Sequence, residues 1–122
     1  MNTVAPQSIA EARRCVREKP YVVLYLSRRG CGVCSAVRPK VMEILASLPE
    51  ALFCPLDLDL IPEAAGEYGV FTIPAILVYV DGRETIREAR YVSMDDLGAR
   101  MERLHELRFG GAAPEPKDPS DS

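Results

Sequence analysis

The chain has 122 residues, a length that suits one domain with a single hydrophobic core. Hydrophobic residues make up 48% and charged residues 27%, the ordinary balance of a soluble globular protein. The net charge of −3 gives no general affinity for nucleic acid, and no apolar run approaches the roughly 20 residues that span a membrane. Residues 1–8 lack the basic and apolar blocks of a secretory signal, so we expect a cytoplasmic protein, and we expect it to be a monomer.

The first predicted elements are a helix and a buried strand. Ser8 and Glu11 have the spacing of a capping box, which predicts a helix from residue 9 to about residue 18. Pro20 ends this helix. Residues 21–27 are rich in Val, Leu and Tyr, a composition that is typical of a buried strand.

A second helix is predicted to begin near Cys31, and Pro39 inside it should cause a kink. Its apolar residues recur at helical spacing and are Val37, Val41, Ile44, Leu45 and Leu48. Pro49 is expected to end the helix. Residues 51–58 then predict a second strand, which contains Pro55.

The rest of the domain is predicted to hold two further strands and two helices. Residues 62–68 predict a short helix, and residues 75–80 predict a third strand. Asp81-Gly82 is a strong turn signal that leads into a fourth strand at residues 83–90. Ser93 would cap the last helix, whose apolar residues are expected on one face: Leu97, Met101, Leu104 and Leu107.

This order of elements indicates an α/β domain. A strand–helix–strand unit requires a parallel pair of strands, and the hairpin adds an antiparallel one. We therefore expect a mixed four-stranded sheet with helices on both faces, formed by residues 1–110. Residues 111–122 are rich in proline, serine and charge, which predicts a flexible tail.

The most informative motif is Cys31-Gly32-Val33-Cys34, at the start of the second helix. Two cysteines three apart at a helix start face each other, and the partial positive charge of the helix N-terminus favours a thiolate. This arrangement suits reversible dithiol–disulfide chemistry, although metal sites use the same spacing. Zinc requires four ligands, and the other candidate ligands are scattered over other elements: Cys15, Cys54 and His105. The scattered ligands make a zinc site the less favoured of the two interpretations.

Together with features farther along the chain, this motif resembles the thioredoxin family. The match extends from about residue 20 to residue 107 and rests on Cys31-Gly32-Val33-Cys34, Pro39, Asp57-Leu58-Asp59, Tyr68-Gly69-Val70, Thr72-Ile73-Pro74 and Asp81-Gly82. The resemblance implies a thioredoxin-like fold. It also implies a thiol–disulfide oxidoreductase that needs no cofactor, reduces disulfides in proteins and is itself reduced by an electron-donor reductase.

The resemblance further implies a role for each residue of the site. Cys31 would be the nucleophile that attacks a substrate disulfide, and Cys34 would resolve the mixed disulfide. Pro74 would follow a cis peptide bond, lie beside the cysteines and present the backbone of Ile73 to a bound peptide. The implied substrate-binding residues are Gly30, Val33, Thr72, Ile73, Pro74, Arg90 and Tyr91.

The chain departs from the family pattern around the cysteines. Gly30 stands where the family has a tryptophan, and Val33 stands where it has a proline between the cysteines. Tyr25 replaces a buried acid, and Pro55 replaces the lysine partner of that acid. Arg90 replaces a glycine that faces the substrate groove.

The first edge strand of the family is reduced or missing, because only a few residues, among them Thr3-Val4-Ala5, precede Pro6. Its loss would place the strand at residues 51–58 on the edge of the sheet. Edge strands tolerate a proline, which cannot donate a hydrogen bond to a neighbouring strand, so Pro55 is consistent with this arrangement.

Two functions stay open on the sequence alone. The chain is either an atypical thioredoxin that reduces protein disulfides or a thioredoxin-fold module that binds partners with weak or no turnover. The positive side chains near the motif, Arg28, Arg29 and Arg38, either stabilise the Cys31 thiolate and attract acidic partners or are solvated charges.

For two other side chains the sequence leaves two roles open, and for three more it predicts a purely structural role. Tyr25 either places its hydroxyl near Cys34 or is simply a core residue, and Arg90 either narrows the groove or points to solvent. The remaining cysteines, Cys15 and Cys54, are expected to be packing residues. We expect His105 to lie on the surface of the last helix.

Overall fold

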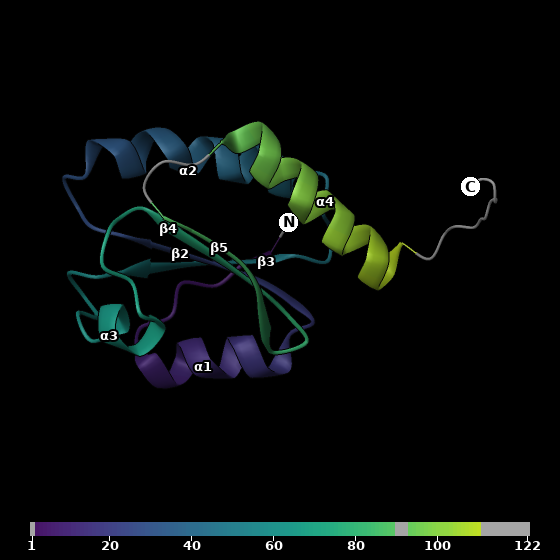
Figure 1. The fold of residues 1–122 in the computed structure, drawn as a ribbon. Coiled ribbons are helices and arrows are strands. Elements are labelled where there is room, and N and C mark those ends of the chain that lie inside the picture. The colour runs from purple at the N-terminus through teal and green to yellow at the C-terminus, as the bar shows by residue number, and fades with distance from the viewer. Residues whose placement is uncertain (1, 90–92, 111–122) are drawn as a thin grey trace, which may run out of the picture.

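The computed structural model describes residues 2–89 and 93–110 and shows a five-stranded sheet between two layers of helices (Figure 1). In chain order the elements are β1 (Asn2–Thr3), α1 (Ile9–Glu18), β2 (Tyr21–Ser27), α2 (Gly32–Leu45), β3 (Leu52–Asp57), α3 (Ala64–Tyr68), β4 (Ala75–Val80), β5 (Arg83–Ala89) and α4 (Met94–Phe109). Helices α1 and α3 cover one face of the sheet, and α2 and α4 cover the other (Figure 1). The predicted α/β architecture with helices on both faces is confirmed.

The sheet is mixed and has the strand order β1-β3-β2-β4-β5. Strand β3 is parallel to β1 and β2, whereas β4 is antiparallel to β2 and β5. The prediction of four strands is short by one, because β1 pairs its two residues with Leu52 and Phe53. The first edge strand is therefore reduced, as expected, and not missing. Pro55 lies on the part of β3 beyond this pairing, where an edge proline is tolerated.

The buried strand β2 divides its side chains between two cores. Successive strand residues point to opposite faces of a sheet. Accordingly Val22, Leu24 and Leu26 pack on the α1 side, and Tyr21, Val23 and Tyr25 pack on the side of α2 and α4. Cys54 is buried in the core on the α1 side, and the half-buried Cys15 packs against that core. The prediction that these two cysteines are packing residues is confirmed.

Local signals placed several element ends correctly. Ser8 caps α1 by accepting a hydrogen bond of 3.2 Å from the backbone N–H of Glu11, as predicted. In a capping box the Glu11 carboxylate would accept from the backbone N–H of Ser8. Here it accepts instead from the backbone N–H of Gln7, one residue earlier, at 2.8 Å. Asp81 and Gly82 have φ angles of 51° and 82°, the left-handed pair that a tight hairpin turn requires.

Two predictions about the C-terminal ends of helices are wrong, one about where α2 stops and one about which residues of α4 are buried. Helix α2 ends at Leu45, before Pro49, so the proline is not its stop signal. In α4, Leu97 and Met101 are buried but Leu107 is 70% exposed, because each three-residue step rotates the side chain by about 300° and turns Leu107 off the apolar stripe.

His105 is half-buried and not the freely exposed surface residue that was expected. Its side chain is 16% exposed, packs against the rings of Tyr21 and Phe109, and contacts the Glu50 carboxylate. A turn between α2 and β3 brings Glu50 to this position, which local spacing in α4 does not reveal. Arg90, Tyr91 and the predicted tail at residues 111–122 lie outside the described residues.

Candidate active site

Cys31 and Cys34 lie where strand β2 passes into helix α2, and they are joined by a disulfide with Cα atoms 5.2 Å apart. Cys31 is the N-cap and not the first helical residue, as its Sγ accepts from the backbone N–H of Cys34 at 3.1 Å. Cys34 is 4% exposed, whereas Cys31 is partly exposed. A reagent in solution therefore reaches Cys31, and the unpaired N–H groups at the helix start favour its thiolate.

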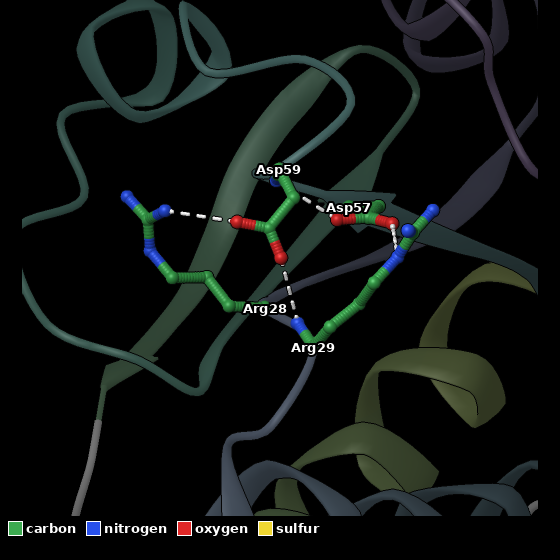
Figure 2. A network of polar contacts seen from close by, with 4 residues as sticks. All are labelled: Arg28, Arg29, Asp57 and Asp59. Atoms are coloured by element: carbon green, nitrogen blue, oxygen red, sulfur yellow. Dashed lines mark hydrogen bonds and ion pairs between the residues drawn. The ribbon is translucent and has the colours of Figure 1, made fainter.

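The loop before Cys31 is held by two carboxylates at the end of β3 (Figure 2). Asp59 accepts from the backbone N–H of Arg29 at 2.9 Å and from the Arg28 guanidinium at 3.2 Å. Asp57 accepts from the Arg29 Nε at 3.3 Å and from the backbone N–H of Asp59 at 2.8 Å. Arg28 and Arg29 are thus paired cations that fix the loop leading to Cys31, a role that neither sequence interpretation contained.

Tyr25 satisfies both sequence interpretations at once. Its ring is fully buried and lies 5.9 Å from the Phe53 ring, so it is a core residue. Its hydroxyl donates a hydrogen bond of 2.6 Å to the backbone oxygen of Cys34. Burial raises the pKa of Tyr25 to about 12, and the nearby Arg38 charge partly opposes this. Tyr25 is therefore a neutral donor to the backbone at physiological pH and does not accept a proton from the thiol.

The predicted substrate-binding loop lies at the same end of the sheet as the cysteines. Ala75, the first residue of β4, pairs with Leu26 near the end of β2, which puts Ile73 and Pro74 next to the chain that leads to Cys31. The Ile73–Pro74 peptide bond is cis, as the resemblance implied. The segment just before this loop is bound to β5, because the Arg87 guanidinium donates hydrogen bonds to the backbone oxygens of Tyr68 at 2.7 Å and Gly69 at 3.2 Å.

Exposed apolar side chains flank this end of the molecule. Val33, between the cysteines, is 55% exposed, and Phe71, two residues before Ile73, is 94% exposed. Gly30 has a φ of 74°, a left-handed conformation that favours glycine. The sequence pattern does not single out Phe71, because an aromatic residue beside the buried Val70 has the pattern of a core residue. Of the remaining predicted residues, Thr72 is exposed, and Arg90 and Tyr91 lie outside the described residues.

Two classes of site find no support in the described part of the chain. Over residues 2–89 and 93–110, no three histidine, cysteine, aspartate or glutamate side chains gather as a metal ion would require. Within the same residues, no helix has both the length and the apolar character needed to cross a membrane.

Known proteins resemble the chain in sequence and in fold. A family model described as Thioredoxin matches residues 5–103. The thioredoxin-like protein YdfQ of Bacillus subtilis (strain 168) is 33% identical over 103 residues, which are 84% of this chain and 92% of that protein. The X-ray structure of Fasciola hepatica thioredoxin has a TM-score of 0.72 at 27% identity and covers 84% of this chain and 98% of its own.

The fold is shared more widely than the sequence. The crystal structure of thioredoxin O2 from Arabidopsis thaliana in the oxidized state has a TM-score of 0.75 at 22% identity, covering 85% of this chain and 95% of that one. The matched region of residues 5–103 includes the disulfide-bonded cysteine pair at the start of α2 and strands β2 to β5 of the sheet that positions it. The chain therefore belongs to the thioredoxin family and is a thiol–disulfide oxidoreductase.

Proposed function

We propose that the chain reduces disulfides in protein substrates and is then reduced by a donor reductase. The observation that supports this most is the unequal exposure of the pair, with Cys31 accessible at the helix N-cap and Cys34 buried behind it. An exposed sulfur can attack a large substrate, whereas a buried one is closed to a protein and is placed to react with its neighbour. A cytoplasmic monomer is the form in which we expect the protein to act.

The reaction proceeds in two exchanges. The Cys31 thiolate attacks one sulfur of the substrate disulfide, forms a mixed disulfide and releases the other substrate sulfur as a thiolate, which takes up a proton. Cys34 loses its proton and attacks the Cys31 Sγ, and the remaining substrate sulfur leaves. The products are a substrate dithiol and the Cys31–Cys34 disulfide, so two electrons pass from the protein to the substrate.

Substrates would dock on the loop before β4. An extended peptide beside the Ile73 backbone would pair with it as an added strand, the mode that exposed backbone groups allow. The exposed side chains of Val33 and Phe71 offer apolar contact to such a peptide, and Gly30 leaves room beside Cys31. Thr72 is exposed and adds to the proposed contact surface, whereas Pro74 is buried and would act by orienting the Ile73 backbone. The family resemblance also implies Arg90 and Tyr91 as substrate-binding residues, and both lie outside the described residues.

Insulin reduction with dithiothreitol as electron donor tests this function against the alternative of a binding module with weak or no turnover. We expect the wild-type protein to accelerate precipitation of the insulin chains and Cys34→Ser to lack turnover, because the mixed disulfide is not resolved. Cys34→Ser should also retain substrates covalently on Cys31. A wild-type rate equal to that of Cys34→Ser would favour the binding module.

A further inference from the structure

A pocket of about 610 Å³ opens beside Cys34 and has no part in the mechanism above. Its walls come from residues 5–7 after β1, from the ends of β2 and β3, and from the first turns of α2. Cys34 lines it, whereas Cys31, Ile73 and Pro74 are not among the described residues of its wall. The pocket therefore lies on the Cys34 side of the redox pair, and the proposed docking loop is not part of its described wall.

The chain's departures from the family pattern shape this pocket. Tyr25 and Pro55, which replace the acid and its lysine partner, both line it. Strand β1 ends at Thr3, and the backbone N–H of Val4 donates one more hydrogen bond of 3.0 Å to the backbone oxygen of Phe53. Residues 5–7 then form a wall of the pocket beside the edge of β3. The volume lies within the range of roughly 300–1,000 Å³ that is typical of small-molecule sites.

One positive charge in the pocket lacks a carboxylate partner. Arg28, Arg29 and Arg38 all line the wall, and Asp57 is the carboxylate among the lining residues. Arg29 is paired with Asp57, and Arg28 with Asp59, so these charges largely cancel. Arg38 belongs to none of the ion pairs between described residues, and its guanidinium lies 5.3 Å from the centre of the Phe53 ring.

Arg38 is also close to the redox pair. It follows Cys34 by four residues on α2, so the two side chains leave the same face of the helix. Its charge acts on Tyr25, whose hydroxyl bonds to the Cys34 backbone. An anion in the pocket would thus find an unpaired cation one helical turn from Cys34.

We propose that this pocket is a second approach to the redox pair, through which small thiols and disulfides that carry a carboxylate reach Cys34. The inference rests on the proposed redox function and adds a class of small-molecule partner to it. In the oxidised protein, a small thiolate attacks the Cys34 Sγ, forms a bond to it and breaks the Cys31–Cys34 bond. Cys31 leaves as a thiolate at the helix N-terminus, where negative charge is stabilised.

A second small thiol completes the reaction. Its thiolate attacks the sulfur of the small molecule in the mixed disulfide, and Cys34 leaves as a thiolate and takes up a proton. The net result converts two small thiols into one small disulfide and delivers two electrons to the protein. The same route in reverse lets a reduced Cys34 attack a small anionic disulfide.

The test uses Cys31→Ser protein and three small disulfides of similar size but different charge. These are dithiodipropionate, which is anionic, bis(hydroxyethyl) disulfide, which is neutral, and cystamine, which is cationic. The rate of mixed-disulfide formation at Cys34 is measured by peptide mass spectrometry, which separates it from reaction at Cys15 and Cys54. We expect the anionic probe to react fastest and the cationic probe slowest.

Variants of charged residues on α2 test whether Arg38 causes the preference for the anionic probe. In the Cys31→Ser background, Arg38→Gln should slow the anionic probe by about three- to tenfold more than the neutral probe, the effect of one charge a few ångströms away at a partly solvated site. Any loss that the neutral probe shares reports the effect of Arg38 on the Cys34 thiolate itself. Arg38→Lys should restore the anionic rate. Lys40→Gln removes an exposed cation of the same helix that does not line the pocket, and it should change none of the rates.

Equal rates for the three probes would overturn the inference, as would an equal loss for all three in Arg38→Gln or a failure of Arg38→Lys to restore the anionic rate. Insulin reduction by the wild-type protein is measured separately. If insulin is not reduced while the charge preference at Cys34 holds, only the proposed protein-disulfide reductase function fails. If insulin is reduced and the preference is absent, only the pocket inference fails.

Discussion

Substitution of Tyr25 tests how Cys34 loses its proton in the second exchange. Burial raises the pKa of Tyr25 to about 12, so the side chain keeps its proton near neutral pH and donates it to the Cys34 backbone oxygen at 2.6 Å. It therefore cannot act as a base for the buried thiol. Burial also disfavours the Cys34 thiolate, so we expect slow resolution of the mixed disulfide.

The two informative variants differ sharply in their expected effects. Tyr25→Phe removes a hydroxyl that is not a base, so the resolution rate should change by less than about threefold, while stability falls by about 1 kcal/mol for one buried hydrogen bond. Tyr25→Asp introduces a carboxylate at the same place, and general-base help is typically worth about 10²–10⁴ in rate. Loss of the ring that packs on Phe53 should cost this variant about 3–5 kcal/mol of stability.

Rapid mixing of the reduced protein with a chromogenic disulfide separates the two exchanges. The first phase reports attack by Cys31, and the second reports resolution by Cys34, so Cys34→Ser should lack the second phase. In the wild-type protein the second rate should rise about tenfold per pH unit below the pKa of Cys34, because only the thiolate reacts. A loss of more than tenfold in Tyr25→Phe, or no gain in a folded Tyr25→Asp, would refute the reasoning.

Three further outcomes follow from other contacts. Asp59→Ala should lower the free energy of unfolding in urea by about 1–2 kcal/mol, because it removes the acceptor of the Arg29 backbone N–H. It should also slow the first exchange phase, because the loop before Cys31 is held less firmly. An unchanged first phase would show that the contact between Asp59 and Arg29 does not position the Cys31 sulfur. The pKa values of Tyr25 and Tyr68 are each raised to about 12, mainly by burial, so the folded state holds these protons more tightly than the unfolded state. The contribution of these tyrosines to stability should be intact below their ordinary pKa of about 10. Between that pH and about pH 12, the free energy of unfolding should fall by about 1.4 kcal/mol per pH unit for each tyrosine. Urea denaturation at a series of pH values measures this fall, and a flat profile would contradict the prediction. Ser8→Ala should cost about 1 kcal/mol of stability through loss of the α1 cap, with Ser8→Asp as the control that retains an acceptor.

Some parts of the candidate active site could be predicted from the sequence, and others could not. Residue type and spacing single out the cysteine motif, whereas the family resemblance implies the loop at Ile73 and Pro74 and the roles of both. The partners that hold the site were not. Asp59 lies 30 residues from Arg29 in sequence, and only the register that pairs Ser27 with Asp57 brings the two together.

The sequence by itself determined the elements whose signals are local. The cap at Ser8, the turn at Asp81-Gly82 and the apolar run of β4 each depend on residues a few positions apart, and α1 and β4 have the predicted bounds. Such signals act through backbone geometry and nearby hydrogen bonds, so they are present before the chain folds.

Only the tertiary structure decided which distant groups meet. It paired the short β1 with β3, set His105 against Glu50, joined the Tyr25 hydroxyl to the Cys34 backbone, and left Arg38 unpaired in a pocket beside the disulfide. These contacts depend on the register of strands and the packing of helices across the sheet, where side chains far apart in sequence compete for the same partners. No spacing within one element carries that information.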